Sequence, residues 1–276
     1  MREIMEPSAV SEAKMKAEVL GSGDPVVLVP GGLTGWLSWE PHAQKFSSDH
    51  KAVRVQLLSV DLGLRNEPLP ANYSVDFETH ALTTTLNELG ISQADFLAWS
   101  YGAEITLNFA LNNPDRIRTL TLIEPPAIWV LRSRGPLSRK VQEQELFIKT
   151  LGPDNVTEDQ LEWFTHFAGF VPEGADARAL PQWPLWVQHR QSLRTGNIAF
   201  RHEDDIQRVR DFQKPVLLFK GEGSSPFLHE IIDILGEEFP NASVETLPGG
   251  HAPQIASMDK FMNIVDSFLT NKGRFD

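Results

Sequence analysis

Short apolar runs alternate along this chain with longer stretches whose apolar residues recur at helical spacing. Six runs are short enough to be buried strands, and they cover residues 25–29, 52–58, 94–99, 118–123, 215–219 and 244–247. Helical spacing marks the segments 75–89, 103–111, 227–239 and 258–269. Strands that alternate with helices predict an α/β fold with a mostly parallel central sheet and helices on both of its faces.

One long segment interrupts this alternation. Between the strands at 118–123 and 215–219 the chain is helical and rich in loops, and it contains four of the seven tryptophans, Trp129, Trp163, Trp183 and Trp186. We expect residues 126–211 to form a helical cap that is inserted into a core made of residues 1–125 and 212–276. Most of the cap's aromatic side chains should pack within it, and the others should line an apolar pocket.

Composition narrows the classes of partner. The 276 residues carry a net charge of −12, which disfavours a nucleic-acid partner, and the chain contains no cysteine, which excludes disulfides and thiolate chemistry. The N-terminus is polar and no apolar stretch approaches the length of a membrane span, so we expect a soluble, cytoplasmic protein with no membrane association. The sequence indicates neither a metal nor a cofactor, and it leaves the oligomeric state open, a homodimer included.

Ser100 lies where the strand at 94–99 gives way to a helix. This position matches the nucleophile elbow, G-x-S-x-G, except that Ala98 replaces the first glycine. The departure is mild because the tight turn needs small neighbours, and Ala98, Gly102 and Ala103 provide them. An ordinary serine in a tight turn is the alternative interpretation, but we take Ser100 as the candidate nucleophile.

A serine nucleophile needs a base and an acid. His251 follows the last strand, and the carboxyl ends of parallel strands share one edge of the sheet, so His251 is expected near Ser100. Many hydrolases of this architecture carry their acid after the strand at 215–219, where this chain has serine. Glu124 and Glu222 remain as candidates, and we favour Glu124 because it ends the neighbouring strand, only about 4.8 Å away. The histidines at 42, 50, 80 and 229 are expected to be solvated.

The loop after the first core strand supplies candidate oxyanion donors. Glycines in Pro30-Gly31-Gly32 allow a backbone amide to approach a substrate oxygen closely. We therefore predict that the amides of Gly32 and Tyr101 form an oxyanion hole.

These motifs resemble the α/β-hydrolase fold family over nearly the full length of the chain. The similar stretches are residues 27–33, 113–118 leading to Glu124, and 248–253, and within the family they look most like the lactonases that open the macrocyclic lactone zearalenone. The resemblance implies a triad of Ser100, Glu124 and His251, with Gly32 and the residue after the nucleophile at the oxyanion hole. Gly31 departs from the pattern, since those lactonases carry an acid there, and Tyr101 is bulkier than expected.

The resemblance extends to the cap. The stretch 183–186 looks like the lactonase segment whose tryptophan packs on substrate, so Trp186 inherits that role. Leu33, Trp129 and Trp183 are the other candidate contacts to an apolar substrate.

The predicted function is that of a cofactor-independent serine hydrolase. We expect it to cleave the ester or lactone bond of an apolar small molecule through an acyl-enzyme. A hydrolase of carbon–carbon bonds in diketones that uses the same residues is one alternative. A non-enzymatic receptor for a small ligand, built on a hydrolase scaffold, is another.

Overall fold

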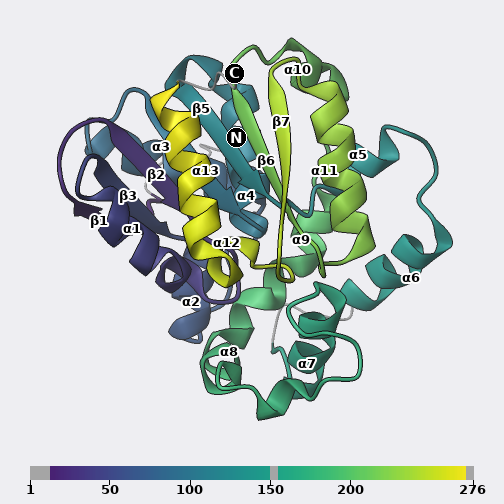
Figure 1. Cartoon of the computed structure of the whole chain (residues 1–276). Helices are drawn as coiled ribbons and strands as arrows, with labels where there is room; N and C mark the ends of the chain where they lie inside the picture. The colour runs from purple at the N-terminus through teal and green to yellow at the C-terminus, as the bar shows by residue number, and fades with distance from the viewer. Residues whose placement is uncertain (1–12, 150–154, 272–276) are drawn as a thin grey trace, which may run out of the picture.

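A seven-stranded sheet forms the centre of the molecule, in the order β1-β3-β2-β4-β5-β6-β7 (Figure 1). The computed structural model describes residues 13–149 and 155–271. Every neighbouring pair of strands is parallel except β1 and β3, which pair antiparallel at one edge. The strands are β1 (Lys16–Leu20), β2 (Pro25–Val29), β3 (Lys51–Gln56), β4 (Ala94–Trp99), β5 (Ile117–Ile123), β6 (Val216–Gly221) and β7 (Ala242–Leu247).

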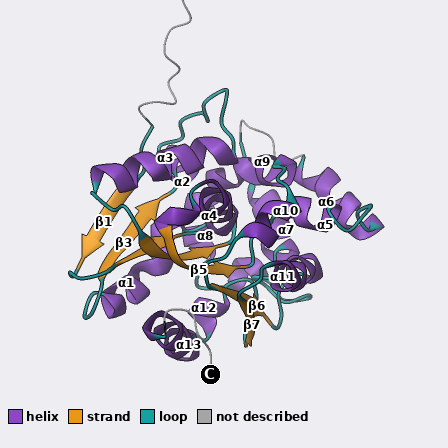
Figure 2. Cartoon of the chain, turned by 90° about the horizontal axis from the view of Figure 1, so that it is seen from above, coloured by secondary structure: helices purple, strands orange, loops and turns teal. Residues whose placement is uncertain are grey.

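Helices cover both faces of the sheet, with α3 and α4 on one side and α1, α12 and α13 on the other (Figure 2). Those of the core are α1 (Glu40–Phe46), α2 (Leu58–Leu64), α3 (Val75–Glu88), α4 (Tyr101–Asn112), α11 (Pro226–Glu238), α12 (Pro253–Ala256) and α13 (Met258–Thr270), with the 3₁₀ helices η2 (Gly35–Trp39) and η3 (Pro114–Arg116). This arrangement confirms the predicted α/β fold.

The sheet has a hydrophobic core on each of its two faces, and alternate residues of a strand belong to different cores. In β2, Val27 and Val29 join the core that includes α3 and α4, whereas Val26 and Leu28 join the core that includes α1 and α13. Successive side chains of a strand point to opposite faces, so a sheet covered on both sides needs apolar residues at every position. This requirement is the reason why β2 reads as a continuous apolar run.

The segment between β5 and β6 is helical, as predicted. It contains α5 (Ile128–Arg132), α6 (Arg139–Ile148), α7 (Glu158–Phe167), α8 (Trp183–His189), α9 (Gly196–Arg201) and α10 (Ile206–Asp211), with η4 (Ala177–Ala179) and η5 (Arg190–Thr195). Helices α6 to α9 gather at one end of the sheet (Figure 1). The division into core and cap at residues 126 and 211 stays a prediction.

The pattern of apolar residues missed three elements of the N-terminal part, β1, α1 and α2. Strand β1 is half exposed and mixes charged with apolar residues. It therefore lacks the continuous apolar run by which the other strands were predicted. Helices α1 and α2 have only seven residues each, too few to display a clear helical period. Among the residues described here, no helix is both long and apolar enough to span a membrane.

Candidate active site

Ser100 occupies a strained corner between β4 and α4. Its backbone has φ 55° and ψ −127°, a conformation that residues other than glycine rarely adopt. Its N–H donates to the carbonyl of Ile123 on the neighbouring strand at 2.8 Å. A Cβ at Gly102 would lie 2.2 Å from the Pro30 carbonyl oxygen, so the second glycine of the elbow is sterically required. Ala98, at the first glycine position, is fully buried in the core, where its methyl group is accommodated.

A chain of hydrogen bonds links Ser100, His251 and Glu124. The Oγ of Ser100 lies 2.8 Å from Nε2 of His251, and Nδ1 of the same ring lies 2.6 Å from Oε2 of Glu124. The side chains of His251 and Glu124 are almost completely buried. The structure thus brings the three predicted residues together in the order nucleophile, imidazole, carboxylate.

The surroundings of Glu124 fix its carboxylate. Its Oε1 accepts the N–H of Gly221 at 2.7 Å and the hydroxyl of Ser224, while Oε2 faces the imidazole. Its backbone is left-handed, with φ 46°, as at Ser100. Ser224 stands in the loop where many hydrolases carry the acid, and here its hydroxyl supports the glutamate instead. Glu222, the other candidate acid, is exposed.

The loop that carries His251 is held from two sides. The backbone N–H of His251 donates to the carbonyl of Gly169, in the segment after α7, at 3.0 Å. The carbonyl of His251 accepts the Nε1–H of Trp99 at 2.6 Å. The ring of Phe170 meets the imidazole edge-on, with centroids 4.9 Å apart. A Cβ at Gly250 would lie 1.9 Å from the Gly169 oxygen, so only glycine permits this close approach.

Gly32 and Tyr101 lie beside Ser100 in the wall of one cavity. A Cβ at Gly32 would meet no atom within 4 Å, which shows that open space faces this residue. At Gly31, in contrast, a Cβ would lie 3.1 Å from Cβ of Ser100 and 3.0 Å from the ring of Trp99. A side chain at position 31 would therefore crowd Ser100 and Trp99, which fits the glycine found there.

The cavity over Ser100 is apolar. Its empty volume is about 630 Å³, including the part that opens to solvent. Its walls combine the elbow with cap and core residues that include Leu33, Phe164, Phe167, Phe170, Phe200 and Phe227. None of the described residues that line it is Lys, Arg, Asp or Glu, and no described group of three or more His, Asp or Glu residues is arranged to hold a metal.

Residues 26–264 match the model of the alpha/beta hydrolase family. The chain belongs to the alpha/beta hydrolase family. A 2-hydroxy-6-oxo-2,4-heptadienoate hydrolase of Pseudomonas putida is 27% identical over 206 residues, which are 70% of this chain and 73% of that protein.

Two solved structures share the fold. An esterase from Exiguobacterium antarcticum superposes with a TM-score of 0.74 at 20% identity, covering 93% of this chain and 95% of that one. Est816, described as an N-acyl homoserine lactone degrading enzyme, gives a TM-score of 0.67 at 17% identity, covering 92% of this chain and 96% of that one.

The predicted substrate contacts of this hydrolase occupy different places. Leu33 lines the cavity over Ser100, and Trp186 lines a second groove that also contains His251. Trp129 and Trp183 line neither space, and both are buried in the large core. The structure thus does not place these two tryptophans in the walls of the cavity or the groove, and their role as substrate contacts stays a prediction.

Other features of the site were beyond sequence reasoning. Phe164, Phe167 and Phe170 belong to the aromatic side chains of the predicted cap, and nothing in the sequence showed that all three line the cavity. His42 was expected to be solvated, and this expectation is wrong: it is fully buried, with Nε2 3.1 Å from the Gln254 carbonyl oxygen, and burial lowers its pKa to about 4. Histidine has no spacing signal that separates a buried position from an exposed one.

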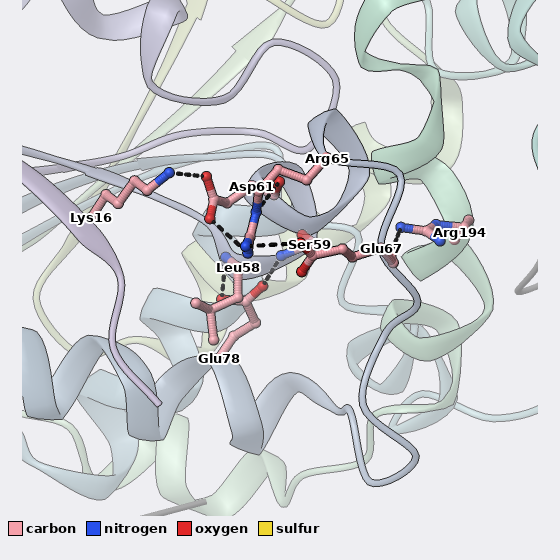
Figure 3. Close-up of polar contacts among 8 residues, drawn as sticks. All are labelled: Lys16, Leu58, Ser59, Asp61, Arg65, Glu67, Glu78 and Arg194. Carbon is pink, nitrogen blue, oxygen red and sulfur yellow. Dashed lines mark hydrogen bonds and ion pairs between the residues drawn. The ribbon is translucent and has the colours of Figure 1, made fainter. Parts of the chain in front are cut away.

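The side chain of Tyr101 enters a buried polar network. Its hydroxyl lies 3.3 Å from that of Tyr73, which donates to Oε1 of Glu78 at 2.5 Å. Burial raises the pKa of both tyrosines and of Glu78. Glu78 also accepts the backbone N–H groups of Leu58 and Ser59, at the start of α2 (Figure 3). The large side chain of Tyr101, which was unexpected after the nucleophile, is thus buried in this network.

The segment that follows α2 is hydrogen-bonded to η5, which forms part of the cavity wall. The guanidinium of Arg194 donates to the carbonyl of Glu67 at 2.8 Å (Figure 3), and Arg194 belongs to η5. Its neighbours Leu193 and Thr195 line the cavity over Ser100. This bond therefore links the chain after α2 to the wall that substrate would touch.

Proposed function

We propose that this protein is a serine hydrolase that cleaves the ester or lactone bond of an apolar small molecule through an acyl-enzyme. The observation that carries the proposal is the continuous hydrogen-bond chain Ser100–His251–Glu124, whose serine end opens on an apolar cavity. Strained backbone at two of the three residues, Ser100 and Glu124, supports it, since strain of this kind gathers at functional sites.

The geometry supports the following sequence of steps. With its proton on Nδ1, donated to Glu124, the His251 imidazole accepts the Ser100 proton at Nε2 while Oγ attacks the carbonyl carbon. The amides of Gly32 and Tyr101 stabilise the negative oxygen that forms. His251 then returns the proton to the leaving oxygen, and water, activated by the same imidazole, hydrolyses the acyl-enzyme.

The lining of the cavity favours an uncharged acyl group. Apolar walls without a described Lys or Arg side chain provide no partner for a substrate carboxylate, and a buried unpaired charge is costly. The Exiguobacterium esterase and the lactone-degrading Est816 share the fold, in agreement with ester or lactone substrates.

Hydrolysis of a carbon–carbon bond is the second candidate, because the Pseudomonas putida relative is named as a heptadienoate hydrolase. Such a substrate carries a carboxylate, for which the described cavity walls provide no cation. We therefore rank the ester or lactone reaction first.

A hydrolysis panel tests the proposal. Short and long acyl esters, macrocyclic lactones and diketones are offered to the wild type and to Ser100→Ala, and acid release is measured. We expect turnover of apolar esters or lactones by the wild type only. Turnover of diketones alone would favour the second candidate, and binding of ligands without turnover of any class would indicate a receptor.

A further inference from the structure

A second apolar groove lies next to His251. It runs between η2, α8 and α12, and its walls include Leu37, Phe170, Leu185, Trp186, His251 and Ile255. Leu37 and Ile255 are 40% and 48% exposed, and they belong to a small set of large apolar side chains that are exposed in the described part of the chain. Exposed apolar residues that gather on one concave surface indicate a binding site.

Three aromatic residues lie at the border that this groove shares with the cavity over Ser100. Trp99, Phe170 and His251 line both spaces. Phe170 contacts the other two rings, with centroids 5.8 Å from Trp99 and 4.9 Å from His251. Ser100, Gly32 and Tyr101 line the cavity alone. The groove is therefore lined by His251 but not by the nucleophile or the predicted oxyanion donors.

The chemistry of acyl transfer assigns the two spaces to the two halves of an ester. When Oγ of Ser100 bonds to the acyl carbon, the bond from that carbon to the alkoxy oxygen breaks, and the proton taken from Ser100 passes from Nε2 of His251 to that oxygen. The acyl half stays bonded to Ser100 beside the oxyanion donors. The leaving oxygen meets Nε2 of His251, and of the two spaces that His251 lines, the groove is the one that the acyl half does not occupy.

We infer that the groove holds the alcohol half of an open-chain ester, and that this half is apolar and larger than the acyl half. No described lining residue is Lys, Arg, Asp or Glu, and the empty volume is about 1200 Å³, against about 630 Å³ for the cavity, both including space that opens to solvent. An open-chain ester passes the shared residues once, whereas the ring of a lactone joins its two halves a second time and would have to pass them twice, so open esters are preferred. This inference rests on the proposed ester hydrolysis.

Two isomeric esters test the assignment, octyl acetate and ethyl octanoate, which have the same atoms but carry the long chain on opposite sides of the ester bond. The wild type is expected to favour octyl acetate. Ile255→Ser should lower kcat/KM for octyl acetate about five-fold, because part of the alkyl chain loses an apolar contact, and leave ethyl octanoate within about two-fold. Val244→Ser, at an exposed position of β7 (40% exposed), is the matched control and should change neither rate.

A reciprocal variant acts on the cavity. Ala199 lines the space over Ser100 and not the groove. Ala199→Leu should lower the rate with ethyl octanoate more than the rate with octyl acetate. If Ile255→Ser reduces both esters equally, or only ethyl octanoate, the assignment of the groove is overturned.

A binding measurement separates this inference from the proposed function. Trp186 lies in the groove and Trp99 borders it, so 1-octanol should change the tryptophan fluorescence of the wild type. Ile255→Ser should weaken this binding about five-fold and Val244→Ser should not. Absence of ester turnover together with this pattern would reject the hydrolase but retain the groove. Octanol binding that Ile255→Ser does not weaken would reject the groove even if esters are hydrolysed.

Discussion

Replacing Glu124 by glutamine should disable the enzyme through the imidazole tautomer while preserving the shape of the site. Oε1 of Glu124 accepts two donors, the N–H of Gly221 and the hydroxyl of Ser224, whereas Oε2 accepts one, from His251. A glutamine has one oxygen, and turning its NH₂ toward Gly221 would leave buried donors facing each other, at a cost of about 1–3 kcal/mol. The oxygen is therefore expected to stay on the Gly221 side.

The NH₂ group then points at Nδ1 of His251. A ring that accepts a hydrogen bond at Nδ1 carries its proton on Nε2, where it cannot take the proton of Ser100. In serine proteases the corresponding loss is about 10⁴ in kcat, and we expect a loss of about 10³–10⁴ for Glu124→Gln. The circular dichroism spectrum should be unchanged.

The assay is steady-state hydrolysis of a chromogenic ester, with Glu222→Gln as matched control. Glu222 is exposed, so its variant should stay within a few-fold of the wild type. A Glu124→Gln enzyme within ten-fold of the wild type, or equal losses in both variants, would refute the assignment of Glu124 as the acid.

Three further predictions concern the nucleophile and two buried titratable groups. Ser100→Ala should fold and lose about 10⁶ in kcat, and a fluorophosphonate should label the wild type at Ser100; labelling at another serine would contradict this. Glu104 is buried, neither of its oxygens has a hydrogen-bond partner in the described part of the chain, and burial raises its pKa well above the usual range. Its native form keeps a proton that the unfolded chain releases, so stability falls as pH rises above about 4.5. Glu104→Gln should flatten this slope in urea unfolding between pH 5 and pH 8; parallel slopes would be evidence against it. The pKa of His42 is lowered from 6.5 to about 4, so the unfolded chain binds a proton that the native state does not, and stability falls by up to about 3 kcal/mol as pH drops through this window. His42→Gln should reduce that fall in unfolding experiments at pH 7 and pH 4.5, and an identical fall in both proteins would exclude the explanation.

Trp186 shows how burial changes an expectation about stability. As a pocket residue it would carry little core packing, but it is only 7% exposed and its ring lies 5.9 Å from that of Phe170. Deletion of a buried tryptophan side chain typically costs about 3–5 kcal/mol. Activity lost in Trp186→Ala would therefore mix stability with substrate contact, which is why the groove is tested at exposed Ile255.

Local sequence was sufficient to locate six of the seven strands along the chain and the candidate residues that follow three of them. A strand buried on both faces favours apolar residues along its length, as in all five residues of β2 and in residues 96–99 of β4, where Asp95 is the polar exception. Because the carboxyl ends of parallel strands meet at one edge, the sequence places Ser100 after β4, Glu124 after β5 and His251 after β7 near one another.

Only the tertiary structure decided which groups touch. Glu124 and Glu222 were both allowed by chain order, but the left-handed backbone at Glu124 and the donors from Gly221 and Ser224 aim the first at His251, while the second is exposed. Likewise, apolar patterning could not tell Phe170, in the cavity wall, from Trp183, in the core. The period of a helix or strand determines which face of its own element a side chain occupies. What that face meets depends on the packing of segments distant in sequence, and no local pattern encodes it.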